Sequence, residues 1–444
     1  MKEVALFTTF SDIQQAYSLN IITQYQIKML LLNGYTPTVI VHETFVPEGI
    51  YAHPQVKLEY IPNVACHNEV VKDETFENDV TLIENRLREI LKDIDVVITH
   101  DIIYQNACLK HNFAARKIAK EFPQIRWLHW IHSATSPLLL NMIRPIFADE
   151  YVDLVQTEFP NSKYVYPNSY AIPSVSKNFN VPSEDVVCVH HPTDLPNYIG
   201  MSKEEEELVY KKEILTADAI TTYPIRLDRG KQVEYVIKTM AMLKEFGLDI
   251  RIIIIDFHST AGDKVTYRDE LKQLAIDWEL NSDEVTFLSE ESDNWTLEVP
   301  QSTVAHFQML SNVFILPSVS ETYSLIAQEA GLMKQVMVLN ADFPPLRSIY
   351  GENAIYRKYS SRYDVMADPF EAMRPESETK TKYGSDNLPE EARKGAEKDY
   401  HKVTAGMIAA RLMHPEMAMS IHLRKNRNLQ TIFKKELEPL FFNN

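Results

Sequence analysis

The sequence predicts an α/β protein made of two doubly wound domains with parallel sheets. The chain has 444 residues, more than one hydrophobic core usually supports, so two domains of roughly 200 residues each are expected. Its composition, 45% hydrophobic and 24% charged, is typical of a folded chain. Short β-branched segments alternate with longer segments of helical spacing, which indicates parallel strands connected by helices.

Residues 1–200 are expected to form the first domain. Apolar residues at helical spacing follow the first strand and end at Asn33-Gly34, a typical helix stop. An acidic segment begins near residue 201, and this change in composition predicts the domain boundary. The expected strands are Val4–Phe7, Thr38–Val41, Val96–Thr99, Trp127–Ile131 and Asp153–Gln156.

The alternation restarts in residues 201–400, which are expected to form the second domain. A polar segment over 365–395 predicts a surface excursion, and residues 401–444 are expected to be helices that pack back toward the first domain. Ligands of such sheets bind beyond the carboxyl ends of the strands, so we expect the chemistry in a cleft between the domains. The expected strands are Ala219–Tyr223, Ile250–Ile255, Val285–Leu288, Val313–Leu316 and Val336–Leu339, and the expected helices are Gln232–Glu245, Tyr267–Trp278, Gln301–Leu310 and Tyr323–Met333.

Composition and charge argue against several classes of protein. Every apolar run is far shorter than the roughly 18 residues that cross a bilayer, so no stable membrane insertion is expected. The N-terminus enters an apolar strand without a signal-peptide cleavage site, and three scattered cysteines favour reduced thiols, so a cytoplasmic protein is expected. A net charge of −17 disfavours a general nucleic-acid binder, although the basic run "HLRKNRNLQTIFKK" leaves a local phosphate track as an alternative to a solvated helix face.

Two glutamates lie eight positions apart in "PSVSETYSLIAQEAGLM", residues 317–333. Glu321 is expected in the turn between a strand and a helix, and Glu329 about two turns into that helix. A carboxylate in the turn can accept hydrogen bonds from sugar hydroxyls, while the backbone N–H groups of Thr322, Tyr323 and Ser324 suit a phosphate. The alternative is an acidic residue that stabilises the helix dipole and a solvated glutamate within the helix.

A basic turn follows the first strand of the second domain in "PIRLDRGKQVEYVIKTMAML". Arg226 can bind the oxygens of a diphosphate in a bidentate manner, and Lys231 can act as a point charge beside the start of the next helix. Arg229 lies in the same turn, with a solvated side chain as the alternative. The turn therefore predicts an anion site beside the two glutamates.

In order and spacing, these segments resemble the donor domain of retaining glycosyltransferases with the GT-B fold. This family, built from two Rossmann-like domains that face a cleft, includes glycogen and sucrose synthases and bacterial lipid mannosyltransferases. Its two glutamates separated by seven residues are matched by Glu321 and Glu329, and its Arg and Lys five residues apart by Arg226 and Lys231. The resemblance extends over about residues 90 to 355 and is strongest after residue 219.

The resemblance implies a role for each matching residue. Glu321 would contact the hexose of a nucleoside-diphosphate sugar and Glu329 the ribose, while Arg226 and Lys231 would hold the diphosphate. His132, at the end of "IRWLHWIH", is similar to the family's histidine beside the sugar. The chain departs from the family in "FTTFSDIQQAY" and "IIIDFHSTAGD", where glycine-rich turns are usual, so contacts from these loops to phosphate, acceptor or base do not carry over.

No metal site and no cofactor are expected. Asp93 and Asp95 form a D-x-D, the metal signature of a different glycosyltransferase fold, but Asp93 closes a helix and Asp95 opens a strand, so the match is interpreted as coincidental. His129 and His132 are three apart in a strand and face opposite ways, which argues against a metal pair and predicts a packed His129. Two fixed cations and a helix terminus supply the charge that the leaving group needs, so activity without a divalent ion is expected.

These observations predict a retaining transferase that moves a hexose from a nucleotide sugar to an acceptor hydroxyl, with a small molecule or a glycan favoured as acceptor. The resemblance implies that the acceptor binds the N-terminal domain, where residues 8–15 would lie at the mouth of the cleft. Three alternatives remain. They are transfer to a hydroxymethylated base in DNA, use of the same donor pocket by a hydrolase, phosphorylase or epimerase, and a sugar-nucleotide-binding protein without turnover.

Overall fold

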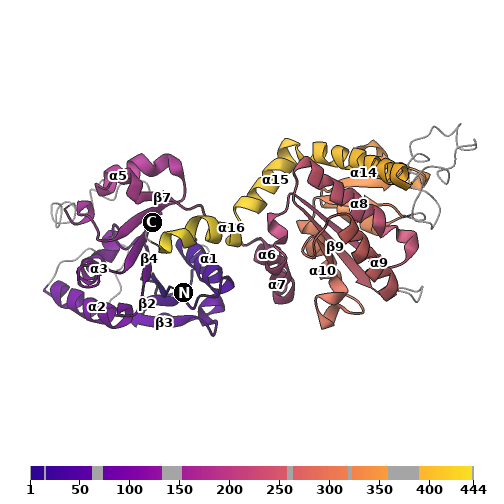
Figure 1. Ribbon diagram of the computed structural model, residues 1–444. Coiled ribbons are helices and arrows are strands. Elements are labelled where there is room, and N and C mark those ends of the chain that lie inside the picture. Colours follow the sequence, from indigo (N-terminus) through magenta and orange to yellow (C-terminus); the bar gives the residue numbers. More distant parts are fainter. Residues whose placement is uncertain are drawn as a thin grey trace, which may run out of the picture. The chain divides into compact units, whose positions relative to one another are not determined.

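The chain folds into two compact units (Figure 1). In the computed structural model, the described residues are 2–14, 17–62, 74–132, 153–257, 264–318, 323–358 and 390–442. The N-terminal unit comprises Met1–Asp194 together with Arg427–Asn444, and the C-terminal unit comprises Leu195–Asn426. The second unit is therefore inserted, in sequence, before the last segment of the first.

A parallel sheet of seven strands forms the centre of the N-terminal unit, in the order β3-β2-β1-β4-β5-β6-β7. Every residue of β1, β2 and β4 is buried, as expected for parallel strands with both faces covered. In the central register, Leu6 of β1 pairs with Val39 of β2 and Ile98 of β4. The strands are β1 (Val4–Phe7), β2 (Thr38–His42), β3 (Lys57–Ile61), β4 (Val96–His100), β5 (Arg126–Trp130), β6 (Ser162–Tyr166) and β7 (Val186–Cys188), and the longer helices are α1 (Ser18–Leu32), α2 (Phe76–Leu91), α3 (Leu109–Glu121) and α5 (Ile172–Phe179).

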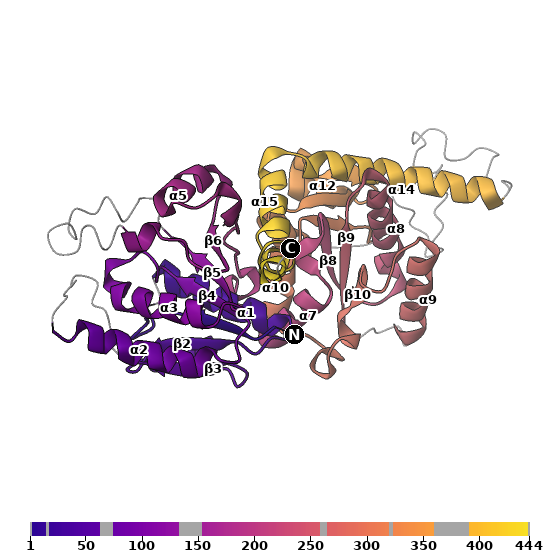
Figure 2. The same ribbon diagram turned by 60° about the vertical axis from the view of Figure 1, so that its left-hand side comes forward.

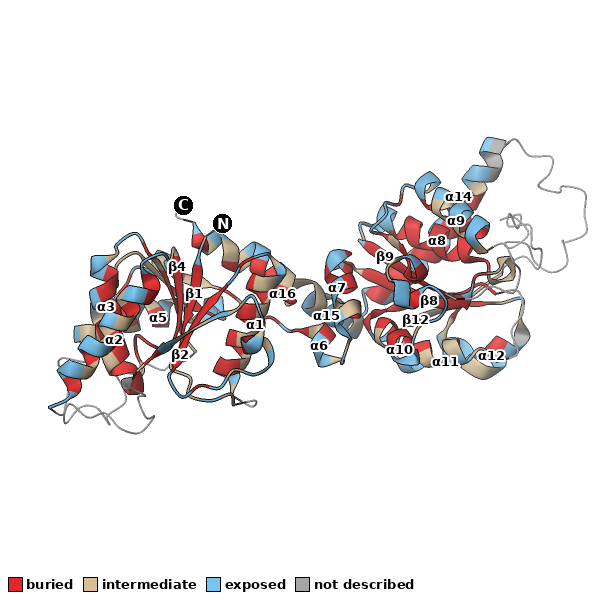
Figure 3. Cartoon of the chain, turned by 90° about the horizontal axis from the view of Figure 1, so that it is seen from below, coloured by how far each residue is buried: buried red, intermediate tan, exposed pale blue. Residues whose placement is uncertain are grey.

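The C-terminal unit has a parallel sheet of six strands in the order β10-β9-β8-β11-β12-β13. All eleven residues of α8 are buried, because α8 lies between this sheet and α14 (Figures 2 and 3). The strands are β8 (Ala219–Arg226), β9 (Ile250–Phe257), β10 (Val285–Phe287), β11 (Val313–Leu316), β12 (Val336–Asn340) and β13 (Ile355–Arg357), and the helices are α6 (Leu195–Tyr198), α7 (Lys203–Lys211), α8 (Val233–Leu243), α9 (Lys264–Asp277), α10 (Gln301–Leu310), α11 (Leu325–Leu332), α12 (Pro344–Tyr350), α14 (Glu390–Leu412) and α15 (Pro415–Asn426).

Both sheets follow the strand order 3-2-1-4-5-6 of a doubly wound Rossmann-like domain, counted within each unit. The predicted fold class is thereby confirmed. The order reverses between β1 and β4 in the N-terminal unit and between β8 and β11 in the C-terminal unit. Ligands of doubly wound sheets bind at this reversal, beyond the carboxyl ends of the two strands.

One predicted strand is wrong, and four strands were not predicted. Residues 153–156 are helical, and the strand of this region is β6, which starts nine residues after the predicted start at Asp153. The missed strands lie at or toward the sheet edges, where one face or one side meets water. In β3 only Ile61 is buried, and β7 and β13 have three residues each, so their sequences carry no long apolar run.

Helices α14 and α15 belong to the C-terminal unit, although the sequence led us to expect residues 401–444 to pack toward the first domain. The reason is the apolar face of α14, on which Ala405, Ile408 and Leu412 are buried in the core of the C-terminal unit. The return to the N-terminal unit begins only at Arg427. The expected excursion over 365–395 lies mostly outside the described residues.

The returning segment is a structural part of the N-terminal unit. It contains α16 (Leu429–Ile432), a π-helical turn over Phe433–Leu437 and a 3-10 turn over Glu438–Phe441. Phe433 is fully buried, with its ring 5.7 Å from that of Tyr35, and the Tyr35 hydroxyl donates to Glu438 at 2.8 Å. Apolar burial therefore joins the two ends of the chain in one core.

Replacing Phe433 with Ala should destabilise the N-terminal unit by about 3 to 5 kcal/mol, because a buried ring is lost and a cavity remains. Hydrogen exchange of peptides from each unit in urea measures the two units separately. The matched control is Phe442→Ala, whose side chain is 48% exposed. Equal destabilisation by both variants would show that the segment only covers the surface.

Candidate functional site

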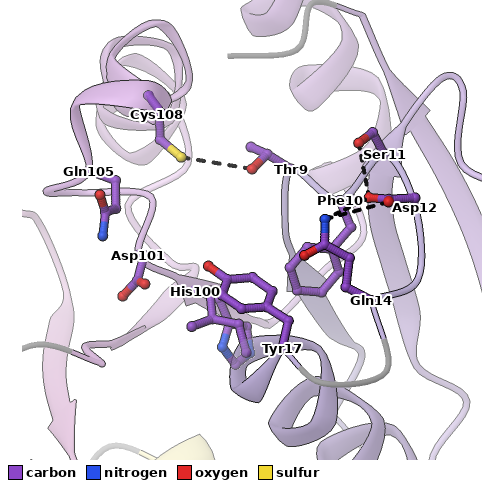
Figure 4. A pocket seen from close by; sticks show the side chains of 12 residues that line it. Thr9, Phe10, Ser11, Asp12, Gln14, Tyr17, His100, Asp101, Gln105 and Cys108 are labelled. Carbon is purple, nitrogen blue, oxygen red and sulfur yellow. Dashed lines mark hydrogen bonds between the residues drawn. The ribbon is translucent and has the colours of Figure 1, made fainter. Parts of the chain in front are cut away.

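A pocket lies at the strand-order reversal of the N-terminal unit, beyond the carboxyl ends of β1 and β4 (Figure 4). It has a volume of about 110 Å³ and is lined by the loop after β1, the start of α1 and the segment from His100 to Cys108. The β1 loop is held by backbone hydrogen bonds, since Thr8 N donates to Ile40 O at 3.0 Å and His42 N to Phe10 O at 2.9 Å. The pocket wall is therefore anchored to β2.

Polar side chains surround this pocket. Figure 4 shows Asp12 and Gln14 on one side, Asp101 and Gln105 on the other, and Tyr17 between them. Within the described part of the chain, the Asp12 carboxylate accepts long hydrogen bonds, at 3.3 Å from the Ser11 hydroxyl and 3.5 Å from Gln14 Nε2. Its oxygens can therefore accept further hydrogen bonds from a ligand.

Cys108 also lines the pocket but is unsuited to act as a nucleophile. Its Sγ lies 3.8 Å from the Thr9 hydroxyl. Burial raises the pKa of the thiol to about 12, so the thiolate form is negligible at neutral pH. Cys108 is a packing residue of the pocket floor.

Asp101 positions the residues at the end of β4 and β5. It has a left-handed backbone with φ of 58°, which is uncommon for a residue with a side chain, and it is 5% exposed. Its carboxylate accepts from the Tyr104 hydroxyl and, at 3.2 Å, from the backbone N–H of His132. Burial raises the pKa of Asp101 to about 6. The carboxylate thus connects the β4 loop to His132.

His132 belongs to a cluster of three histidines at the carboxyl ends of β4, β5 and β7. Its Nε2 lies 3.1 Å from His100 Nδ1, and its ring stacks on that of His191 at 5.8 Å. His100 Nε2 lies 2.7 Å from the side-chain oxygen Oε1 of Gln26, and with this amide orientation Nε2 carries the proton and His100 Nδ1 accepts. His132 Nε2 must then donate, which leaves His132 Nδ1 as an acceptor for a hydroxyl.

The histidine cluster is uncharged at neutral pH. Burial lowers the pKa of His100 well below its ordinary value and that of His132 to about 3, and the neighbouring His191 acts in the same direction on both. Burial also lowers the pKa of His191. A neutral imidazole is suited to hydrogen bonding with a sugar hydroxyl rather than to holding a phosphate.

His129 is packed, as predicted from the strand alternation. It is fully buried, its Nδ1 lies 3.0 Å from the Thr99 hydroxyl, and its ring contacts Phe159 at 4.4 Å. It therefore faces the core while His132 lies in the cluster beyond the strand end.

The strand-order reversal of the C-terminal unit carries the predicted basic turn. Arg226 ends β8 with a side chain 50% exposed, 3.9 Å from Asp228. Lys231 lies in a 3-10 turn over Arg229–Lys231, and its carbonyl accepts from the Tyr223 hydroxyl at 3.0 Å. Gln232, with φ of 49°, then turns the chain into α8. Both predicted cations thus lie between β8 and the amino end of an eleven-residue helix.

Arg229 forms a partly exposed ion pair within the C-terminal unit. Its guanidinium makes two hydrogen bonds to the Glu270 carboxylate, at 2.7 and 2.8 Å, and lies 4.7 Å from the centre of the Tyr267 ring. This bidentate pair fixes the turn against α9. Arg229 therefore supports the shape of the turn that presents Arg226 and Lys231.

Helix α11 follows β11, the strand next to β8, so the second predicted motif lies at the same sheet edge. The helix begins at Leu325, two residues later than expected, because Ser324 adopts a left-handed backbone with φ of 65°. The Tyr350 hydroxyl donates to Ser324 O at 2.9 Å, and Tyr323 is 45% exposed. Glu329 is partly buried and accepts from Gln301 Nε2 at 3.5 Å. Glu321 and Thr322 lie outside the described residues.

Like Asp101, Asp256 at the carboxyl end of β9 was not predicted as a site residue from the sequence. Asp256 accepts from Ser289 N at 3.1 Å and from the Ser289 hydroxyl at 2.7 Å, and Lys264 lies 3.4 Å away. These partners occupy the carboxylate, so Asp256 ties β9 to the segment after β10. The missed residues His100 and Asp101 share one signal, because both follow the predicted strand Val96–Thr99, whereas His191 lies three residues after the short strand β7.

The described residues contain neither a metal-binding cluster nor a membrane-spanning helix. No group of three or more His, Cys, Asp or Glu side chains there is arranged to hold a metal ion. No helix in the described ranges has both the length and the apolar character needed to cross a membrane.

Comparison with known proteins returned structural similarities only. No family model and no curated protein matches the chain. A glycosyltransferase from Rickettsia africae is 13% identical, with 99% of this chain and 98% of that one covered and a TM-score of 0.34. Anabaena HepE in complex with UDP and glucose is 12% identical, with 99% of each chain covered and a TM-score of 0.34. Sucrose-phosphate synthase from Thermosynechococcus elongatus is 13% identical, with 95% and 99% covered and a TM-score of 0.33.

The pKa values predict that the N-terminal unit loses stability as the pH falls below about 6.5. The unfolded chain protonates His132 near pH 6.5 but the folded chain only near 3, so unfolding takes up a proton between these values, and His100 and His191 act in the same direction. Asp101 opposes this between about 4 and 6, because its raised pKa lets the folded chain bind a proton first.

Replacing His132 with Asn should therefore lower the slope of unfolding free energy against pH, by at most about 1.4 kcal/mol per pH unit. Urea unfolding of the N-terminal unit at about pH 7, 6 and 5, followed by hydrogen exchange, measures the slope. A slope equal to that of the unchanged chain would mean that His132 titrates alike in both states.

Proposed function

We propose that the chain is a retaining glycosyltransferase of the GT-B type, which moves a hexose from a nucleoside-diphosphate sugar to an acceptor hydroxyl. The observation that carries the proposal is the pairing of Arg226 and Lys231 with the amino end of α8 at the strand-order reversal of the C-terminal unit. Cations and helix N–H groups together suit a diphosphate. Helix α11, after the adjacent strand, adds a second helix start at the same edge.

The two cations would act on the leaving group. As the bond between the anomeric carbon and the phosphate oxygen breaks, negative charge grows on the diphosphate, and Arg226 and Lys231 stabilise it. The planar guanidinium of Arg226 can donate to two phosphate oxygens at once, and the Lys231 ammonium provides a compact positive charge. The backbone of both residues is held at the end of β8 and in the turn before α8, which keeps the two cations near the leaving group.

The proposed donor contacts follow the family motif residue by residue. Glu321 would accept hydrogen bonds from the hexose, Glu329 from the ribose hydroxyls, and the backbone of Thr322, Tyr323 and Ser324 would donate to phosphate. Two of these residues are described: Ser324 occupies the N-cap position of α11 without a side-chain capping bond, and Glu329 lies on that helix. His132 would meet a hydroxyl of the transferred sugar as a neutral imidazole.

Retention of configuration requires attack on the face that the diphosphate leaves. The acceptor oxygen would bond to the anomeric carbon on that face while its proton passes to the departing phosphate oxygen. Atoms and charge balance without a protein base. Asp101 is not needed as one, since its carboxylate already accepts from Tyr104 and from His132 N.

The nucleic-acid alternative depends on the basic run near the C-terminus, and the structure engages part of that run. Arg424 donates to the carbonyls of Ala217 and Asp218, at 2.8 and 3.2 Å, and Lys425 pairs with Asp218 at 2.7 Å. These two cations hold α15 against the C-terminal unit. They are therefore poorly placed to follow a phosphate backbone, and a small molecule or glycan stays the preferred acceptor.

Replacing Arg226 or Lys231 with Ala should lower kcat roughly 100- to 1,000-fold, the usual effect of losing one preorganised group at a site of developing charge. Release of nucleoside diphosphate from a panel of nucleotide sugars, with and without candidate acceptors, measures turnover, and NMR of the product reports the anomeric configuration. Lys402→Ala is the control, because it removes a cation from an exposed pair with Glu245. Near-normal turnover by Lys231→Ala, with folding confirmed, would overturn the assignment.

Turnover should persist in EDTA, because Arg226, Lys231 and the start of α8 supply positive charge to the leaving group. The assay compares initial rates after dialysis against EDTA and after addition of Mg²⁺ or Mn²⁺. A rate abolished by EDTA and restored by either ion would contradict this expectation.

A further inference from the structure

The two units have the same strand order, but the loops at the point where this order reverses carry side chains of opposite charge. In the C-terminal unit, the loop after β8 presents Arg226 and Lys231. In the N-terminal unit, the loops after β1 and β4 present Asp12 and Asp101, and none of the twelve described residues that line the pocket there is Lys or Arg. Equivalent positions of two similar sheets thus offer opposite surroundings to a ligand.

The N-terminal pocket has the groups that recognise hydroxyls. Thr9 and Tyr17 offer hydroxyls, Gln14 and Gln105 offer amides, and the Asp12 carboxylate can accept further hydrogen bonds. Carboxylate and amide oxygens accept from hydroxyl groups, while the ring of Tyr17 provides an apolar surface beside them. Such a combination of an aromatic ring with hydroxyl, amide and carboxylate groups suits a sugar ring.

A phosphate would meet unfavourable conditions in the same pocket. At an effective dielectric constant of about 20, two like charges about 4 Å apart repel by roughly 4 kcal/mol. The phosphate would have the carboxylates of Asp12 and Asp101 beside it, and the described lining residues include no cation to offset them. The pocket therefore discriminates against anions by charge.

The size of the pocket limits what enters it. Its volume of about 110 Å³ is below the roughly 300 Å³ at which ligand sites commonly start, so it takes one ring or the end of a longer molecule.

We propose that this pocket binds the acceptor as an uncharged polyhydroxylated group, such as the terminal sugar of a neutral glycan, and rejects phosphorylated acceptors. The proposal rests on the proposed function, since it names the acceptor class of that transferase. Asp12 accepts hydrogen bonds from acceptor hydroxyls, and Tyr17 packs against the ring.

Ligand-observed NMR with the full chain tests the proposal without donor or turnover. The probes are neutral mono- and disaccharides and their phosphate esters. At least one neutral sugar should bind tenfold or more tightly than its phosphate ester. Equal or tighter binding of the esters, or no binding of any neutral sugar in the panel, would overturn the proposal.

Reversing the charge at Asp12 is the second test of the proposal. Asp12→Lys should weaken binding of the neutral sugar at least tenfold and raise the affinity for its phosphate ester. Asp12 is exposed on the loop after β1, so the substitution is compatible with folding. Asp93→Lys is the matched control, because it makes the same change of charge on a side chain 83% exposed in the same unit. Identical behaviour of both variants would show that net charge, and not the pocket, controls binding.

Failure of the acceptor class and failure of the transferase can be distinguished. If nucleoside diphosphate is released and only phosphate esters accelerate its release, the acceptor class is wrong and the transferase stands. If no nucleotide sugar is bound or cleaved while neutral sugars bind and Asp12→Lys reverses the preference, the transferase is wrong and the pocket chemistry stands.

Discussion

Reversal of the winding direction beside the first strand of each sheet is the constraint on which the rest of the molecule depends. Connections on either side of β1 and β4, or of β8 and β11, lead away from each other, so the carboxyl ends of these strands are left for loops. The described candidate residues lie on such loops, on the helices that start from them or at the end of the neighbouring strand β5. The apolar pattern determines the fold, and the fold determines where a ligand can bind. The polar residues at that place then determine which ligand binds and which reaction is possible.

The two reversals are specialised by local structure as well as by charge. The basic turn is stiffened by a bidentate pair between Arg229 and Glu270 and by a hydrogen bond to the carbonyl of Lys231. The acidic pocket is stiffened by Asp101, whose left-handed backbone lets one carboxylate reach both Tyr104 and His132 N. In each case one side chain supports a neighbouring part of the site: Arg229 the basic turn, and Asp101 the backbone of His132.

The sequence predicted most of the strands that are buried on both faces of their sheet. Val96–Thr99 reads as an apolar run because β4 is covered by helices on either side, and the basic turn could be placed because it follows such a strand. Edge strand β3, in which only Ile61 is buried and Lys57 and Glu59 interrupt the apolar residues, carries no comparable signal. Asp101 and His100 were missed for another reason. A single acid or histidine in a loop has no period, and its partners come from Gln26 and from Tyr104, which only the folded chain brings to it.

The return of residues 427–444 to the N-terminal unit also bears on how the protein is made. A nascent chain can bury the core of the C-terminal unit as soon as Asn426 has left the ribosome, whereas the first unit to be translated still lacks Leu429, Ile432 and Phe433. At bacterial to eukaryotic elongation rates, the wait between Asp194 and Arg427 is on the order of tens of seconds. During that interval the apolar surface that Phe433 will cover is accessible to chaperones and proteases. A prematurely terminated chain would keep this apolar surface exposed and would therefore be a substrate for degradation.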